Sequence, residues 1–410
     1  MANTIKVLTM FAKAVLSVLE DRLVLGQLVY RDLEAEYAKG GHNGFEIGNT
    51  IKMKKPAKYQ AVSGATISAY QDHTEDEVSM VVDEQWHVPI QFSSIEATLD
   101  LPYEKWQERV VVPAAVPLAN KIDEKIAALY VNLHEAVGTP ATSPSSFEDM
   151  QAIDTRMEQI LAPPEKRCAV YNVTDAASLV AGLKGHFVPD LNKGWLQRNQ
   201  IGSPIGALTN YRSNNLVIAH TGGAGGGTPL IKGASQTGAS LLTDGWPAST
   251  AVLKAGDIIT IADVNAVHDV SKVSYGRVKQ FVVTADVTSD GSGDATVAIS
   301  PSITTSGAFQ TVDAGPANDA AITIASGTGA NAHAANLAFS TQTFGLAVVP
   351  LVKPRGATYC VRMTSKQGLS IRIINDYDVT NDKDRMRMDI LFGVKTLYPE
   401  TGVRVFGKGY

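Results

Sequence analysis

Glutamate is almost confined to the first 165 residues of this chain. Fifteen of its sixteen Glu residues lie at or before Glu165, and the last is Glu400. Glu is favourable in helices and depleted in strands. The distribution therefore predicts that most of the helix lies in the first 165 residues and that the remainder is rich in strands. A chain of 410 residues has room for two to four domains of ordinary size.

The overall composition excludes several classes of protein. The chain is 44% hydrophobic and 19% charged, which provides enough apolar material for a folded core and argues against disorder. No run of 18 apolar residues occurs, so an ordinary membrane-spanning helix is not expected. The net charge of −5 is unsuited to gripping nucleic acid through bulk electrostatics.

The N-terminal half contains several helix patterns. Between residues 5 and 25, apolar side chains recur every three or four positions, as on one face of a helix. This stripe consists of Ile5, Leu8, Phe11, Ala12, Val15, Leu16, Leu19 and Leu23. A similar stripe predicts a long helix of roughly 24 residues that starts near Ala114, after a shorter helix at 103–111. Ser146 and Asp175 are expected to cap two further helices.

Residues 47–92 show the alternation of a two-stranded β-hairpin. Ile51 and Met53 are apolar between polar neighbours, and the same pattern returns from Val78 to Val82 after a hydrophilic stretch. Such a hairpin has little core of its own, and isolated hairpins are only marginally stable. We therefore expect an extended arm that rests on a neighbour.

The arm carries opposite charges on its two sides. The predicted contact residues are Lys52, Lys54, Lys55, Lys58 and Tyr59 on the basic side, and Asp72, Glu75 and Asp76 on the acidic side. The basic side could contact nucleic acid, but complementary charge on one arm favours docking onto a like subunit. An isolated helix as short as the N-terminal one is marginal, so its apolar stripe must also be covered. We therefore add Leu8, Phe11, Val15 and Leu19 to the predicted intersubunit contacts.

A second change in composition begins at HTGGAGGGTP (220–229), which we interpret as a linker. From residue 228 to residue 345 the chain has no Glu, and short strand-like runs alternate with turn sequences such as SDGSGD. This pattern is typical of a small immunoglobulin-like sandwich or a barrel, and we expect an inserted β-domain. Three more strand patterns, at 353–363, 369–379 and 388–399, then close an α+β domain.

The sequence offers no enzyme or metal signature. In the glycine-rich stretch Thr228-Pro229 follows the last Gly and no basic residue is adjacent, so the Lys of a phosphate loop is missing. No two of the eight His residues lie three or four positions apart. The two cysteines, Cys168 and Cys360, are too few for a multi-cysteine zinc site. Five Asp residues between Asp376 and Asp389 are interleaved with Lys and Arg, which favours an ion-pair network over a calcium loop. We therefore expect no catalytic residue, no cofactor and no metal.

Four stretches together resemble one known family. They are IGNTIKMKKPAKYQAVSGATI (47–67), FSSIEATLDLPYEKWQERVVVPAAVPLANKIDEKIAALY (92–130), the strand-rich segment 253–303, and RMDILFGVKTLYPETGVRV (387–405). In this order they resemble the major capsid (coat) proteins of tailed bacteriophages. The likeness is to the family typified by the coat protein of the short-tailed Salmonella phage, which carries an inserted β-domain. It covers nearly the whole chain and is weakest over residues 304–345.

The resemblance implies the tailed-phage major capsid fold, of α+β class. Its parts would be an N-terminal arm with an amphipathic helix (1–46), an extended hairpin loop (47–92), a peripheral domain with a long spine helix (93–145), the first part of an axial domain (146–227), an inserted all-β sandwich or barrel domain (228–345) and the closing strands of the axial and peripheral domains (346–410).

The function implied by the resemblance is structural. Such proteins assemble into the pentamers and hexamers of an icosahedral head that encloses double-stranded DNA without reading its sequence. The implied partners are further copies of the chain, a scaffolding protein or its equivalent and a portal protein, with a decoration protein as a further candidate and no membrane. The implied location is the virion, after assembly in the host cytoplasm. Two alternatives stay open: a tail or baseplate structural protein, and an enzyme such as a hydrolase, for which no nucleophile–base pair is found.

Overall fold

The computed structural model describes most of the chain in two compact units. The described residues are 3–31, 50–59, 61, 65, 70–71, 76–93, 112–182, 208–216, 219–329, 332–354, 356, 359–365 and 368–408, with side chains described from residue 12 onwards. Unit 1 combines Met1–Met53, Val78–Ile126 and Phe344–Lys395, and unit 2 combines Lys54–Glu77, Ala127–Thr343 and Thr396–Tyr410. Each unit therefore draws on segments that lie far apart in the sequence.

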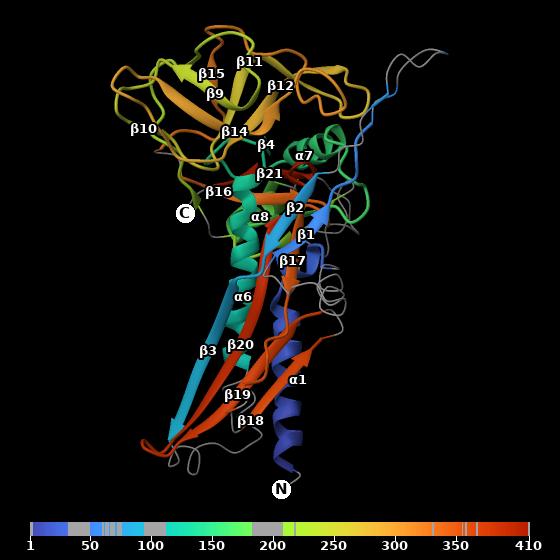
Figure 1. Ribbon diagram of the computed structural model, residues 1–410, viewed down its shortest axis with the longest axis vertical. Coiled ribbons are helices and arrows are strands. Elements are labelled where there is room, and N and C mark those ends of the chain that lie inside the picture. Colours follow the sequence, from blue (N-terminus) through green and yellow to red (C-terminus); the bar gives the residue numbers. More distant parts are fainter. Residues whose placement is uncertain are drawn as a thin grey trace. The chain divides into compact units, whose positions relative to one another are not determined.

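Unit 1 is built on a five-stranded sheet. Its strands are β3 (Glu84–Ser93), β17 (Phe344–Val348), β18 (Tyr359–Thr364), β19 (Ser370–Asp378) and β20 (Lys383–Thr396). The long strand β20 pairs antiparallel with β19 and, from Lys383↔Ser93 to Phe392↔Glu84, with β3. Figure 1 shows β3, β19 and β20 as long strands running side by side. A single strand near the C-terminus thus holds two distant segments in one sheet.

One face of this sheet is apolar, and α1 (Asn3–Arg22) packs against β18 and β19 (Figure 1). Ile371 and Ile373 of β19 and Met388 of β20 are at most 1% exposed, as are Val15 and Leu19 of α1. From Ala12 onwards, the apolar stripe predicted for the N-terminal helix is therefore covered within the chain itself.

Helix α6 (Val112–Ala127) also belongs to unit 1. Its Lys121 and Lys125 ammonium groups lie 5.0 and 5.7 Å from the ring centre of Trp86 on β3. The Asp123 carboxylate of the same helix accepts hydrogen bonds of 2.9 Å from the amides of Val24 and Gly26. It thereby holds the start of the short helix α2 (Leu25–Leu28).

Strands β1 (Thr50–Lys54) and β2 (Glu77–Val81) pair with each other. Ile51 and Met80 are buried, while Thr50, Lys52 and Val81 are exposed. This alternation confirms the two predicted strands, but residues 84–92, which the predicted hairpin loop included, belong to β3 and pair with β20.

Unit 2 contains a mixed sheet with helices around it. The sheet order is β4–β21–β16–β5–β6, and β7 also pairs with β16. Its strands are β4 (Glu135–Val137), β5 (Cys168–Tyr171), β6 (Thr209–Arg212), β7 (Ala219–His220), β16 (His333–Phe339) and β21 (Gly402–Phe406). The helices are α7 (Phe147–Gln159), α8 (Val173–Gly182) and the 3-10 turns η2 (Ala128–Asn132) and η4 (Pro399–Thr401).

Ser146 caps α7 as predicted, with a reciprocal pair of hydrogen bonds to Asp149. Helix α8 is capped by Asn172, one turn before the predicted Asp175.

The second part of unit 2 is a closed β-barrel. Its strand order is β15–β11–β12–β14–β9–β8. The strands are β8 (Leu230–Ile231), β9 (Gly238–Asp244), β11 (Ile258–Val267), β12 (Ser274–Val283), β14 (Ala295–Ile303) and β15 (Ile322–Ile324), with a small pair formed by β10 (Ala251–Leu253) and β13 (Val287–Thr288). The edge strands β8 and β15 meet through a bridge between Leu230 and Ala321 and a 3.0 Å bond from the Ile231 amide to the Ala320 carbonyl. This closure leaves no open edge, so the domain is a barrel and not an immunoglobulin-like sandwich.

The strands of the barrel end at Ile324. Strand β16 lies within the segment 228–345 that was predicted as the insertion, but it pairs with β5 and β21 of the neighbouring sheet. All seven of its residues are buried. A strand buried on both faces carries no alternating pattern, which is why the sequence does not separate it from the barrel strands.

The glycine-rich stretch is packed against the barrel and is not a free linker. The amides of Ala224 and Gly225 donate 3.0 Å bonds to the carbonyls of Ala251 and Val252. A Cβ atom on Gly223 would lie 2.3 Å from the Val252 carbonyl oxygen, and Gly225 has φ +59°. The glycines are required here for close approach and for left-handed backbone.

The spine helix is shorter than predicted. Helix α6 has 16 residues and gives way at Ala128 to a 3-10 turn, after which β4 begins at Glu135. Strand β4 pairs in parallel with β21, so Ala136 is buried by a sheet and not by one face of a helix. Leu133 of the predicted helix lies between the 3-10 turn and β4. The predicted helix at 103–111 lies outside the described residues.

The division between helix and strand follows the Glu distribution. Within the described ranges, every α-helix ends by Gly182, and every later element is a strand except η4. No helix in these ranges is both long and apolar enough to cross a bilayer.

Candidate subunit-interaction site

The basic side of the hairpin is anchored inside unit 2. The amide of Lys55 donates a 2.7 Å hydrogen bond to the Asp76 carbonyl, which extends the pairing of β1 and β2. The Lys55 ammonium lies 3.9 Å from Oε1 of Glu400 and 5.0 Å from the ring centre of Tyr398. The start of the arm is therefore held against the η4 turn by an ion pair and a cation–π contact.

Lys58, three residues further along the arm, pairs with the barrel. Its ammonium donates to Oδ1 and Oδ2 of Asp269 at 3.0 and 2.9 Å. Burial would raise the pKa of Asp269, but the hydrogen bond and charge of Lys58, together with Lys272, lower it below its ordinary value. The carboxylate that pairs with Lys58 therefore belongs to the same chain and not to a neighbouring subunit.

The other predicted contact residues fall into three groups. Lys52, Lys54, Tyr59 and Asp76 are exposed, Tyr59 by 59%. Asp72, Glu75 and the side chains of Leu8 and Phe11 lie outside the described residues. Val15 and Leu19 are 0% exposed within their own chain, because α1 packs against β18 and β19. These two side chains have no surface left to offer a neighbour, so their place is in the subunit's own core.

A buried carboxylate that the sequence did not single out joins the barrel to the rest of unit 2. Oε2 of Glu135 on β4 accepts hydrogen bonds from Arg156 of α7 at 2.7 Å and from Arg277 of β12 at 3.0 Å. Oε1 accepts from Lys279 of β12 at 2.9 Å. Glu135 is 0% exposed, so this cluster is an internal clasp and not a surface ion pair. A sequence signal did exist, since Arg277 and Lys279 stand two residues apart and must share one face of a strand.

The surroundings of the cluster shift the pKa values of Glu135 itself and of the adjacent His134. Burial alone would raise the pKa of Glu135, but the charges of Lys279 and Arg277 outweigh it and hold that pKa well below its ordinary value. Burial lowers the pKa of His134 from 6.5 to about 3, and the nearby charge of Lys279 acts in the same direction. His134 is therefore neutral in the folded protein at any mild pH.

His134 makes the fold sensitive to mild acid. Below pH 6.5 the unfolded chain binds a proton at His134 that the folded chain takes up only near pH 3, so stability falls over this window. We expect His134 to remove about 2 kcal/mol of unfolding free energy between pH 6.5 and pH 5. The free energy of unfolding in urea at pH 7.5 and pH 5.0 tests this. The variant His134→Gln should lose correspondingly less between the two pH values, and an equal loss in variant and wild type would contradict the assignment.

A second buried junction surrounds Asp257 at the base of the barrel. Its carboxylate lies 2.8 Å from Nε2 of His220 and accepts from the amides of Gly223 and Lys254 at 2.9 and 2.7 Å. Nδ1 of His220 lies 3.0 Å from the Tyr130 hydroxyl. An Asp–His–hydroxyl row can serve catalysis, but Tyr130, His220 and Asp257 are at most 6% exposed. No substrate can reach them, and the row pins the glycine-rich stretch to the barrel.

Arg404 completes this junction from β21. It is 0% exposed, and its guanidinium donates to the carbonyls of Gly256 and Tyr130 at 2.7 and 2.9 Å. Burial lowers the pKa of Arg404 to about 10, so the side chain stays charged at neutral pH.

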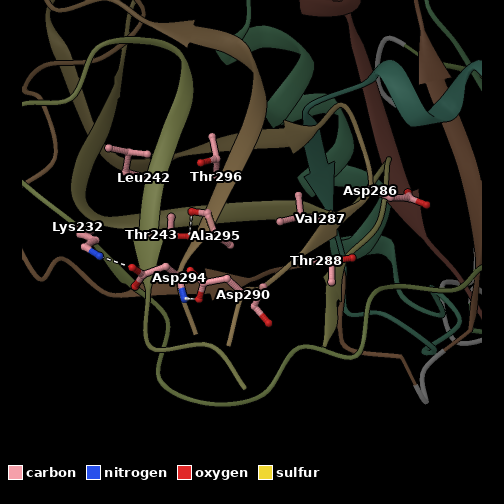
Figure 2. Close-up of a pocket in the computed structure, with 11 residues that line it drawn as sticks. Lys232, Leu242, Thr243, Asp286, Val287, Thr288, Asp290, Asp294, Ala295 and Thr296 are labelled. Atoms are coloured by element: carbon pink, nitrogen blue, oxygen red, sulfur yellow. Dashed lines mark hydrogen bonds and ion pairs between the residues drawn. The ribbon is translucent and has the colours of Figure 1, made fainter. Parts of the chain in front are cut away.

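The barrel surface carries a pocket of about 580 Å³ with three carboxylates on its wall (Figure 2). Asp294 is paired with Lys232, and Oδ1 of Asp290 accepts from the amides of Ser292 and Asp294 at 2.8 and 2.9 Å. Asp286 accepts from the Ala255 amide at 2.9 Å. Each of the three carboxylates therefore already has a partner within the barrel, and that of Asp290 lies in its own loop.

The described residues do not assemble a reactive centre. They contain no group of three or more His, Cys, Asp or Glu side chains that could hold a metal ion. Burial raises the pKa of both free thiols, Cys168 and Cys360, so neither is an activated thiolate. The acidic cluster near the C-terminus forms ion pairs, Arg372 and Arg387 with Asp389 and Arg385 with Asp378.

Solved structures with a similar fold include phage proteins. The solved structure of Mycobacterium phage Che8 matches with a TM-score of 0.50 and 12% identity, over 95% of this chain and 92% of that chain. The mature capsid of bacteriophage PhiM1 matches with a TM-score of 0.44 and 10% identity, over 88% and 82%. The fold is the tailed-phage capsid fold, of mixed α+β class.

Sequence relatives agree with the fold. The major capsid protein of Acyrthosiphon pisum secondary endosymbiont phage 1 is 24% identical over 340 residues, which cover 78% of this chain and 79% of the relative. The family model of the P22 coat protein (gene protein 5) matches residues 1–407. The chain therefore belongs to the P22 coat protein family, a family of structural subunits of phage capsids.

Proposed function

We propose that the chain assembles, as the major capsid subunit, into the pentamers and hexamers of an icosahedral phage head that encloses double-stranded DNA. The observation that carries this proposal is the family match across residues 1–407. The negative net charge supports it, because a wall that bound DNA through bulk electrostatics would resist packing and release. The experiment is protein analysis of nuclease-treated phage heads, in which this chain should be the most abundant protein around protected DNA.

The proposal assigns no catalysis to the chain. Its support is the match to the P22 coat protein family, whose members are structural subunits, together with the burial of the Asp–His–hydroxyl row formed by Asp257, His220 and Tyr130. The partners would be further copies of the chain, a scaffolding protein or its equivalent, a portal protein and a decoration protein. Assembly would take place in the host cytoplasm before the chain becomes part of the virion. A tail or baseplate structural protein is the alternative, and it would form tubes or rings in place of closed shells.

The hairpin is proposed as the main intersubunit arm. The triple variant Lys54→Glu, Lys55→Glu and Lys58→Glu should leave the subunit folded but prevent shell formation. Each exposed ion pair contributes only about 0–1 kcal/mol, so the fold tolerates the change, but a closed shell repeats it in every subunit. Circular dichroism and sedimentation velocity measure the two properties.

A matched control keeps the charge change and moves it off the arm. Lys166, Lys254 and Lys395 are exposed, and reversing these three to Glu changes the net charge by the same amount. The control should assemble normally. Normal shells from the arm variant would remove the arm from the proposal.

A further inference from the structure

We propose that the inserted barrel is a clamp for the assembly arm of its own subunit, with Asp269 as the residue that positions Lys58. The inference rests on the proposed function, because it assumes that the hairpin is an assembly arm. It adds a role for the barrel: it sets the position of the arm before a neighbour arrives.

Asp269 lies on a turn that is ordered by its own hydrogen bonds. The turn joins β11 to β12, and the His268 amide donates to the Val273 carbonyl at 2.9 Å. Nδ1 of His268 accepts from the amides of Val270 and Ser271 at 3.2 and 3.0 Å. The carboxylate of Asp269 is therefore presented from a fixed backbone.

The carboxylate is shared between the barrel and the arm. Lys272 of the same turn lies 3.4 Å from Oδ1, its side chain is only 6% exposed, and it also donates to the Gln310 carbonyl at 3.3 Å. Lys58 of the arm reaches both carboxylate oxygens, at 3.0 and 2.9 Å. Lys272 therefore holds the Asp269 carboxylate in place from the barrel side. Lys58 of the arm then pairs with this carboxylate from its other side.

Two anchors three residues apart define the direction of the arm. Lys55 is held at Glu400 and Tyr398, and Lys58 is held at Asp269. A hairpin without its own core would otherwise lose conformational entropy when it docks on a neighbour. Holding its base in place beforehand reduces that loss, which is the physical benefit of the clamp.

Zero-length crosslinking tests the contact directly. A carbodiimide joins the Lys58 amine to the Asp269 carboxylate only if the two groups touch, and mass spectrometry identifies the joined peptides. The full chain is used as an equal mixture of unlabelled and ¹⁵N-labelled copies at a concentration below assembly. We expect joined peptides that are entirely light or entirely heavy. Mixed light–heavy peptides, or no 58–269 crosslink, would overturn the clamp.

Charge exchange tests its role in assembly. Lys58→Glu and Asp269→Lys should each abolish the crosslink and raise the subunit concentration needed for assembly by about two- to fivefold. Lys58→Arg keeps a cation opposite Asp269 and leaves Lys272 with its carboxylate partner, so this variant should assemble at the wild-type threshold. A threshold raised equally by Lys58→Arg and Lys58→Glu would overturn the positioning role.

The control is Asp263→Asn on the same barrel. Asp263 is exposed and has φ +61°, a backbone angle that Asn also tolerates. This variant should assemble at the wild-type threshold. If the wild-type chain forms no shells at all, the proposed function fails while the crosslink still decides whether the barrel holds the arm.

Discussion

Glu135→Gln should be among the most destabilising single substitutions in unit 2, with an expected loss of about 3–5 kcal/mol of unfolding free energy. The substitution removes the only buried anion that faces Arg156, Arg277 and Lys279 in the described contacts. Three largely buried cations would then be left close together without an anion to compensate them. Urea unfolding at neutral pH measures the loss.

Glu165→Gln is the matched control, because it makes the same chemical change at an exposed position of unit 2. An exposed substitution of this kind is expected to stay within about 0.5 kcal/mol of wild type. Equal losses of unfolding free energy in the two variants would show that the Glu135 cluster makes no special contribution to stability. The pH dependence gives a second check: because the pKa of Glu135 is lowered, its contribution is present above pH 4.5 and should be lost as the pH falls further.

Leu19→Ala should cost unit 1 about 2–5 kcal/mol. Leu19 is 0% exposed on the face of α1 that packs against β18 and β19, so truncation leaves a cavity between helix and sheet. Ser17→Ala, on the exposed side of the same helix, should have little effect. Thermal unfolding of both variants compares them directly.

Deletion of residues 1–25 extends the same test to assembly. It uncovers the strands that α1 protects, so we expect soluble or aggregated subunits and no closed shells. Regular particles from the deleted chain would show that the helix is dispensable for assembly.

The elements of the fold were largely predictable because each has a local cause. The alternation around Ile51 and Met80 identifies β1 and β2, and the Ser146 cap identifies the start of α7. The barrel strand β14 was visible for the same reason, since its buried positions alternate with more exposed ones. Local patterns of this kind need only neighbouring residues.

The pairings that decide the architecture are not local. Barrel closure depends on contact between Leu230 and Ala321, and no short pattern distinguishes a closed barrel from a sandwich. The apolar repeat of the spine helix continues beyond Ala127, but the α-helix ends there, and from Glu135 the chain is a strand because β21 is available to pair with β4. The spacing of apolar residues in a sequence indicates which side chains are buried. It does not indicate which other element of the fold covers them.

The predicted intersubunit site stays a prediction, while the structure shows partners within the chain for two of its lysines, Lys55 and Lys58. Lysines on the arm do pair with carboxylates, but Lys58 finds Asp269, more than two hundred residues away, in the same chain. The Glu135 cluster escaped notice because its cations come from α7 and β12, which only the folded chain brings to β4. Complementary charge in a sequence therefore indicates pairing without telling whether the pair is within a subunit or between subunits.

The central claim is that this chain builds a closed capsid shell, and the most direct measurement is negative-stain electron microscopy of the purified full-length protein after expression. The account predicts closed shells with pentameric and hexameric clusters on their surface. Tubes or flat rings as the only assemblies would contradict it and favour a tail or baseplate protein.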